Sequence, residues 1–332
     1  MMRNTPFASP LGPSATDYLA HMRALGRGYD GAERILRHID AFLARTNSDL
    51  SQASFSEWCL TNAHLRSGVR RDRMRTVRNL CLYRRRTEPT CFLPDIAQFP
   101  PNHQPIRPHI FTEAEIRNLL KAADELPPNP NSPLHSRVYR LAIVLLYTTG
   151  LRRGEMVRLL IGDYEPSEHI LLIRESKFHR SRLVPLSADA VQEIDTYLKG
   201  RALKGFPVSP KSPLLGNGQR GQRAYAGSTI SVGMRPLFRT ARIRTNAGWV
   251  PRTHDIRHSF AVHALLRWYR TGEDVQAKLP FLSTYMGHVS VVSTQHYLHF
   301  VERTAVQASD RFEARYGVLV SASPHDQGDA SR

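Results

Sequence analysis

Cysteine and long hydrophobic runs are both scarce in this sequence of 332 residues. Its three cysteines, Cys59, Cys81 and Cys91, form no Cys-x-x-Cys pair, so they indicate neither a zinc ribbon nor a disulfide framework. The longest apolar stretch, Leu141 to Tyr147, is far too short to span a bilayer, and Met1 to Pro13 lacks the apolar run of a signal peptide. We therefore expect a soluble, cytoplasmic protein that uses no membrane.

Acidic residues are few relative to basic ones. The chain has 29 Asp and Glu against 46 Lys and Arg, which gives a formal net charge of +17. Such an excess favours a polyanionic partner, and arginine matches the geometry of a phosphate better than lysine does. A ribosome-associated protein or a merely basic surface would have the same composition, so charge alone does not separate these classes.

The length of the chain allows two domains, and the apolar pattern divides it accordingly. The division is marked by five prolines between residues 94 and 110, where no periodicity is visible, as expected of a stiff extended linker. The expected segments are a flexible arm (1–13), a helical domain (14–93), a Pro-rich linker (94–110), a second domain (111–320) and a disordered tail (321–332).

Helical spacing of apolar residues predicts four helices in the first domain, at Ser14–Leu25, Ala32–Ala44, Phe55–Leu65 and Ser67–Arg86. Trp58 and Leu60 are the expected core anchors of the third. The fourth carries eight arginines and one acid, Asp72. A solvated face is the commoner explanation for any single arginine, but eight like charges repel unless an anion lies alongside, so we favour a phosphate-binding face. The candidate contacts are Arg70, Arg71, Arg75, Arg78 and Arg85.

The second domain opens with signals for buried helices. Thr112 to Glu115 is a capping box, and an apolar helix from Val138 ends at Gly150. Arg152 follows in a tight turn, where it could equally cap the carbonyls that end this helix. Another helix is expected to continue through Leu160.

A small antiparallel sheet is expected next. The strands His169–Arg174 and Ser181–Leu186 enclose a hairpin with Lys177 near its tip, where a lysine is commonly just a solubilising charge. Arg201–Gly227 is expected to be a loop with few core residues. Amphipathic helices are expected at Ser228–Ala241 and at Val301–Tyr316.

The stretch from Thr253 to His299 carries the candidate chemistry. His254 and Arg257 are one helical turn apart, and His288 and Tyr297 follow. Fixed cations, an imidazole and a phenol hydroxyl can hold a phosphodiester and attack it without a metal. His254 and His258 also have the spacing of a zinc-protease helix, but a metal ion would face Arg257, so we discount a metal site. A DNA-binding regulator without catalysis, reading DNA through Ser228–Ala241, stays open.

Five short motifs follow one another along the second domain. They are Thr149-Gly150-Leu151-Arg152-Arg153-Gly154-Glu155, Lys177 before Arg182-Leu183-Val184-Pro185-Leu186, His254-Asp255-Ile256-Arg257-His258, Met286-Gly287-His288 and Tyr297-Leu298-His299. Together they resemble the tyrosine recombinase (phage integrase) family. The resemblance covers about Phe111 to Tyr316, and the helical N-terminal half is compatible with that family's core-binding domain. The long Arg201–Gly227 loop is similar to transposon-encoded members, and Met286 stands where leucine is usual, a tolerable change.

The resemblance implies a two-domain DNA clamp, mainly α with a small antiparallel sheet, that cleaves and rejoins DNA through a 3′-phosphotyrosine. It implies no cofactor and no metal, double-stranded DNA with inverted-repeat-type sites as substrate, and a homotetramer joined through the C-terminal helix. A type IB topoisomerase shares this chemistry and is not separated by sequence. The implied roles are a phosphate-activating pocket of Arg152, Lys177, His254, Arg257 and His288, a nucleophile, Tyr297, and a carboxylate that positions the pocket, Glu155.

Two of these roles also follow from acid–base chemistry. A phenol with a pKa near 10 is protonated at neutral pH and needs a base or a positive field, for which His254 is our candidate. The departing 5′ oxygen needs a proton, which a lysine on a hairpin could supply, so Lys177 is our candidate acid. Tyr285 lies close by but is expected to be a core or rim residue.

Overall fold

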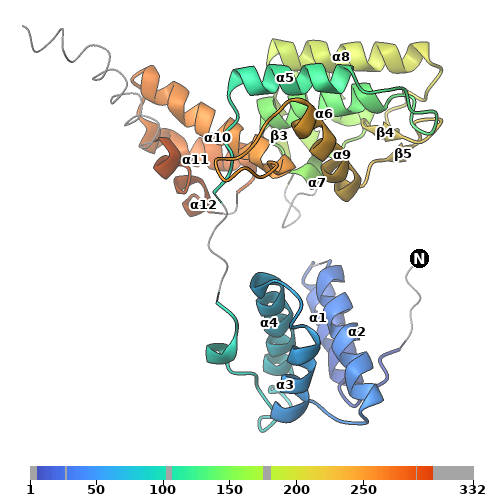
Figure 1. The fold of residues 1–332 in the computed structure, drawn as a ribbon, viewed down its shortest axis with the longest axis vertical. Helices are drawn as coiled ribbons and strands as arrows, with labels where there is room; N and C mark the ends of the chain where they lie inside the picture. The colour runs from blue at the N-terminus through green and yellow to red at the C-terminus, as the bar shows by residue number, and fades with distance from the viewer. Residues whose placement is uncertain (1–5, 27, 102–106, 175–180, 289, 302–332) are drawn as a thin grey trace, which may run out of the picture. The chain divides into compact units, whose positions relative to one another are not determined.

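The computed structural model describes residues 6–301 except 27, 102–106, 175–180 and 289. Its contacts separate the chain into two compact units, residues 1–107 and 108–332 (Figure 1). Helices dominate both units, and the strands are short and antiparallel. The mainly helical fold with a small antiparallel sheet is therefore confirmed. Within the described ranges, no helix is both long and apolar enough to cross a membrane.

The first unit is built from helices α1 to α4. Their apolar faces meet in a core that includes Leu36, Leu43, Trp58 and Leu80, all fully buried. The helices α1, α2 and α4 contact one another, and α3 packs on α2. The four predicted helices are all present, with ends shifted by at most four residues. Their bounds are Gly12–Ala24 (α1), Asp30–Arg45 (α2), Gln52–Thr61 (α3) and Ser67–Arg84 (α4).

Two expectations for this unit were wrong. Leu60 is 74% exposed and does not anchor the core, because Trp58 and Phe55 fill the inner face of α3. The arm expected at 1–13 is packed where it is described: Leu11 is fully buried, and the Asp40 carboxylate accepts hydrogen bonds from the Ala8 and Ser9 backbone N–H groups, each at 2.9 Å. A buried carboxylate that satisfies these backbone donors leaves no apolar signature in the sequence.

The first half of the expected linker also departs from an extended conformation. Ile96–Gln98 forms a short 3-10 helix, η1, and Phe99 is buried in the core of the first unit. Arginines of α4 hold this segment: Arg71 donates to the Pro100 carbonyl at 2.7 Å, and Arg78 donates to the Pro94 carbonyl. The segment therefore belongs to the first unit as far as Pro101, and residues 102–106 lie outside the described ranges.

The helix α6 (His135–Thr149) is the centre of the second unit. Its neighbours are α5 (Glu113–Asp124), α8 (Ala188–Leu203) and α10 (Thr253–Arg270) (Figure 1). Its buried side chains cover more than one face, as expected of a helix that packs against several neighbours. The predicted capping box begins α5, where the Thr112 hydroxyl accepts from the Glu115 backbone N–H and the Glu115 side chain accepts in return.

The two predicted strands belong to a three-stranded antiparallel sheet. In its middle, β2 (Ile170–Ile173) pairs with β1 (Tyr164–Glu165) and with β3 (Arg182–Pro185). The register places Ile173 opposite Arg182, so these two residues flank the hairpin. The helix expected to continue through Leu160 is shorter: α7 covers Arg153–Met156, and the 3-10 helix η2 covers Ile161–Asp163.

The segment Arg201–Gly227, expected to be a loop with few core residues, contributes more to the core than expected. Leu214, Leu215 and Tyr225 are buried in the main core, and a second small sheet pairs β4 (Gly216–Asn217) with β5 (Arg223–Ala224). Arg201 ends up fully buried and donates to the carbonyls of Pro207, Pro213, Leu214 and Gly221. One guanidinium thus orders a segment whose sequence lacks apolar periodicity.

The remaining helices are α9 (Gly227–Thr240), whose predicted inner residues are buried, α11 (Val275–Met286) and α12 (Val292–Gln295). The helix α9 packs on α5, whereas α11 packs on α10 and α12. Side chains of α10 and α11 form a separate core that also contains Tyr297 and Val301. The rest of the helix expected at Val301–Tyr316, and the tail expected at 321–332, lie outside the described residues.

Candidate active site

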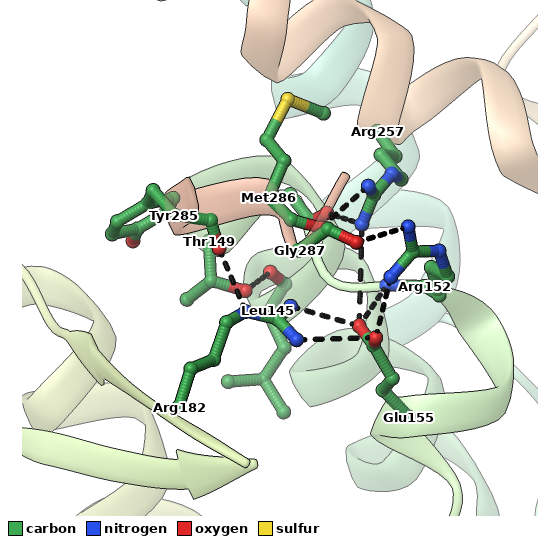
Figure 2. Close-up of polar contacts among 10 residues, drawn as sticks. Leu145, Thr149, Arg152, Glu155, Arg182, Arg257, Tyr285, Met286 and Gly287 are labelled. Atoms are coloured by element: carbon green, nitrogen blue, oxygen red, sulfur yellow. Dashed lines mark hydrogen bonds and ion pairs between the residues drawn. The ribbon is translucent and has the colours of Figure 1, made fainter. Parts of the chain in front are cut away.

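Glu155 lies at the centre of a cluster of arginines from three distant parts of the chain. Its carboxylate contacts Arg152 at 2.8 Å, Arg182 at 3.0 Å and Arg257 at 4.0 Å (Figure 2). The Glu155 side chain is only 2% exposed. Arg152 begins α7, Arg182 begins β3, and Arg257 lies in the second turn of α10. The fold therefore gathers three cations around one buried anion.

The charges of this cluster shift the pKa values of its members. Burial alone would raise the pKa of Glu155, but the hydrogen bonds and positive charges of Arg182 and Arg152 lower it to about 2. Burial lowers the pKa of Arg257 to about 10, with the charge of Arg152 acting in the same direction. At neutral pH the carboxylate is ionised and Arg257 remains protonated, so the cluster carries an excess of positive charge.

Two glycines end the helices whose terminal carbonyls accept hydrogen bonds from the arginines. Gly150 ends α6 and Gly287 ends α11, both with a positive φ, of 58° and 66°. Arg257 donates to the Gly150 carbonyl and, at 2.7 Å, to the Met286 carbonyl, while Arg152 donates to the Gly287 carbonyl. A Cβ at position 287 would lie 2.7 Å from the Arg182 guanidinium, so this position requires glycine.

The Tyr297 hydroxyl is held inside the same unit by a histidine. Tyr297 is 3% exposed, and its hydroxyl lies 2.9 Å from Nδ1 of His258. Burial raises the pKa of the Tyr297 phenol, which the positive charges of Arg257 and Arg152 oppose. Burial also lowers the pKa of His258, to about 3, with the nearby His254 in support, so the imidazole is neutral at neutral pH. A neutral imidazole can accept a hydrogen bond from the phenol.

The hydrogen-bond partner of the Tyr297 hydroxyl is His258 and not His254, the base that we expect from the sequence. Helix geometry places the two rings on one face of α10, in a T-shaped contact with centroids 4.6 Å apart. Burial and the charge of Arg257 lower the pKa of His254 to about 4. The spacing that we considered only for a metal pair was the available signal for His258.

His288 also lies beside Tyr297. Its ring is nearly parallel to the tyrosine ring, with centroids 6.3 Å apart, and its Nδ1 lies 2.8 Å from the Thr294 hydroxyl. Burial and the charge of Arg257 lower its pKa to about 4. The structure thus brings Arg152, Glu155, Arg257, His288 and Tyr297 together in one region of the second unit.

Other candidates are placed differently or not described. Lys177 lies in residues 175–180, outside the described ranges. Tyr285 donates to the Pro185 carbonyl and stacks on Phe260, which supports its reading as a rim residue. Arg182 is part of the second motif, but nothing in the sequence places it against Glu155, which it contacts in the structure. In the described ranges, no group of three or more His, Cys, Asp or Glu side chains is arranged to hold a metal ion.

Four of the five arginines expected to bind phosphate on α4 have partners within the first unit. Arg71 and Arg78 hold the Pro-rich segment as described above, and Arg85 donates to the Cys91 carbonyl at 3.1 Å. Arg75 forms an exposed ion pair with Asp72 at 2.6 Å. Arg70 is half-buried and lines a small cavity with Trp58 and Cys59.

The fold and the site define a mainly helical enzyme whose centre combines a buried tyrosine with histidines and clustered arginines. Comparison with known proteins gives the family. Residues 109–303 match the phage integrase family. The chain is 32% identical to y4rB of Sinorhizobium fredii, named as an integrase/recombinase, over 90% of this chain and 96% of that protein. It is 30% identical to the tyrosine recombinase XerA of Pyrococcus horikoshii, over 57% of this chain and 56% of that protein.

A solved structure shares the fold. A crystal structure of XerH site-specific recombinase bound to a palindromic difH substrate matches with a TM-score of 0.62 at 19% identity, covering 86% of this chain and 80% of that one. The protein therefore belongs to the phage integrase family and is a site-specific recombinase of the tyrosine type.

Proposed function

We propose that this recombinase cleaves and rejoins duplex DNA through a covalent 3′-phosphotyrosine on Tyr297, without a metal ion or ATP. The observation that carries this proposal is the position of the Tyr297 hydroxyl, 2.9 Å from a neutral histidine and in the region of the Glu155-centred arginine cluster. A phenol beside a proton acceptor and fixed cations has the groups that attack on a phosphodiester requires.

Arg152 and Arg257 are the proposed phosphate ligands. Attack on the phosphodiester adds negative charge to its non-bridging oxygens, and a unit charge pair at 4 Å contributes about 4 kcal/mol when the effective dielectric constant is about 20. A guanidinium has five N–H donors. The hydrogen bonds described above use two of them in each arginine, on Glu155 and Gly287 for Arg152 and on Gly150 and Met286 for Arg257. Donors therefore remain for phosphate oxygens.

His258 is the proposed first acceptor of the tyrosine proton. Its Nδ1 is the contact of the hydroxyl, and its low pKa keeps that nitrogen unprotonated at neutral pH. In this tautomer Nε2 of His258 carries the hydrogen. The His254 ring packs on the His258 ring. We keep His254 and His288 as phosphate-side groups of the pocket. Lys177 remains our candidate for protonating the 5′ oxygen, on sequence grounds.

The phosphotyrosine bond preserves the energy of the phosphodiester, so the reverse attack by a 5′ hydroxyl needs no ATP. We propose that the DNA carries inverted-repeat-type sites and that four copies assemble on it through the C-terminal segment, each closing its two units as a clamp. The net charge of +17 and the palindromic substrate in the XerH crystal support this. We expect the protein to act in the cytoplasm, on the nucleoid.

The experiment is a covalent trapping assay on a nicked duplex that carries a recombination site, in the presence of chelator. The wild type should yield a protease-sensitive adduct on the 3′ end of the cleaved strand. Tyr297→Phe should bind the same duplex and give no adduct, because only one oxygen is lost. An adduct of undiminished yield from Tyr297→Phe, or one that requires added divalent metal, would contradict the proposal.

The two alternatives give different outcomes in the same assay. A DNA-binding regulator would bind without any adduct in the wild type. A type IB topoisomerase-like enzyme would form the adduct and relax supercoiled DNA, but it would not exchange strands between paired sites.

A further inference from the structure

Arg182 connects the hairpin strand β3 to two parts of the active site. Its guanidinium makes a bidentate contact with Glu155, with Nη1 3.2 Å from Oε1 and Nη2 3.0 Å from Oε2. Its Nε donates to the Tyr285 carbonyl at 2.8 Å (Figure 2). The side chain is only 11% exposed. It is better buried than Arg152, whose side chain is 26% exposed.

Each contact of Arg182 fixes a group that the proposed reaction uses. Glu155 is the carboxylate that also holds Arg152, so the two arginines share one anion. Tyr285 belongs to the last turn of α11, two residues before Gly287 and three before His288. The close approach of the guanidinium to Gly287 leaves no room for a side chain there. Arg182 thus joins β3, α7 and the end of α11.

We propose that Arg182 is a positioning residue for strand transfer: it holds Glu155, and through it Arg152, in the orientation that receives the phosphate, and it fixes the turn that presents His288. The inference rests on the proposed function of the Tyr297 site. Bidentate arginine contacts fix the orientation of a carboxylate as well as its charge, which a lysine cannot do.

The contact also explains the ionisation of Glu155. Arg182 contributes the largest of the effects that lower the pKa of this buried carboxyl, while burial alone raises it. Without Arg182, the pKa of Glu155 should rise, so that protonation weakens its hold on Arg152 at pH values where the wild type is unaffected. The cleavage rate would then acquire a dependence on pH that belongs to Glu155.

Arg174 provides a matched control on the opposite strand. It follows β2 directly, next to Ile173, the residue that pairs with Arg182. Its Nε donates to the buried carboxylate of Asp163, whereas Arg182 donates to the buried carboxylate of Glu155 through Nη1 and Nη2. Asp163 lies on η2, where it accepts from the Leu160 backbone N–H, and not in the active site. Arg174 therefore resembles Arg182 in its ion pair and its place beside the hairpin, but among the described residues it does not contact the active site.

The test compares the full-length wild type with Arg182→Met, Arg182→Lys and Arg174→Met on a nicked duplex. It measures DNA affinity, and the single-turnover cleavage rate at saturating protein, from pH 5.5 to 8.5.

Arg182→Met should bind DNA like the wild type but cleave it about 100-fold more slowly, as expected when a positioned group is displaced. Its cleavage rate should also fall at acid pH. Adding Glu155→Gln to Arg182→Met should remove that acid limb. Arg182→Lys should have an intermediate rate, and Arg174→Met the wild-type rate.

Each contrary result has a definite meaning. Wild-type cleavage by Arg182→Met, a loss confined to affinity, or an equal loss in Arg174→Met would overturn the positioning role. If thermal unfolding shows that Arg182→Met does not fold, Arg182→Lys decides, and its cleavage at the wild-type rate and pH profile would overturn the role. Absence of an adduct in the wild type would instead contradict the proposed function itself.

Discussion

The arginines of α4 and those around Glu155 show two ways in which a protein accommodates many like charges. On α4 and in the two residues that follow it, eight arginines lie close together in sequence, between residues 70 and 86. Those with described partners mostly hold backbone carbonyls or exposed acids of the same unit. Around Glu155 the arginines lie far apart in sequence and share one buried carboxylate. A run of arginines in the sequence therefore did not predict where arginines cluster in the structure. They cluster around Glu155, a single buried carboxylate.

The largest effect should come from removing that anion. Glu155→Gln leaves buried guanidinium groups without their counter-charge, and breaking one partner of a buried ion pair costs about 3 kcal/mol or more in the free energy of unfolding. Glu33→Gln is the matched control, since Glu33 also contacts two arginines, Arg23 and Arg37, but at the surface of the first unit. It should cost about 1 kcal/mol or less.

Urea unfolding followed by circular dichroism gives the total loss, and hydrogen exchange read peptide by peptide assigns it to a unit. Equal losses in the two variants would show that burial around Glu155 does not distinguish the two sites.

A smaller effect should appear in the dependence of stability on pH. The pKa values of His254, His258 and His288 are about 4, 3 and 4 in the folded protein, below the usual value near 6.5. Between about pH 4 and 6.5 the unfolded chain then binds more protons than the folded one. Their contribution to stability is therefore complete above pH 6.5 and is lost as the pH falls toward 4. The lowered pKa of Glu155, about 2, acts below this window.

His258→Gln should reduce the slope of unfolding free energy against pH, between pH 5 and 6.5, by at most about one proton per molecule. His64→Gln, a change at an exposed residue of the first unit, should leave the slope as in the wild type. An unchanged slope in His258→Gln would mean that this imidazole is not held neutral beside Tyr297.

The smallest effect should come from a single exposed arginine of α4. Among the described residues, Arg75 pairs with Asp72 across an exposed i,i+3 contact, so it can exchange this partner for a phosphate. Arg75→Ala in the full-length protein should reduce the slope of log affinity against log salt by about one. Asp72→Asn, which releases the arginine, should tighten binding. If neither variant changes DNA affinity or its salt slope, this face of α4 is solvated.

Much of the fold was predictable because it depends on local signals. Capping boxes, helical periodicity and the terminal glycines placed α5, α6 and α9 close to their observed bounds. The failures involve polar contacts between distant residues: Asp40 anchors the N-terminal segment, Arg71 and Arg78 fold the Pro-rich segment, and Arg201 orders 201–227. Such contacts leave no period in the sequence.

The candidate site divides in the same way. The motifs named Arg152, Arg257, His288 and Tyr297, and the structure brings these residues together. Spacing could not decide between His254 and His258, since both lie on one face of α10 and only the packing of Tyr297 selects one. Arg182 was invisible as a contact of Glu155, because the two are 27 residues apart and meet only in the folded unit.

The central claim is that the Tyr297 hydroxyl attacks the phosphodiester, and mapping the adduct tests it most directly. The covalent product formed on a nicked duplex would be digested with protease and nuclease, and the modified peptide sequenced by tandem mass spectrometry. The account predicts a nucleotide joined through its 3′ phosphate to Tyr297. Attachment to Tyr285, Ser293 or His299, or a link through a 5′ phosphate, would contradict it.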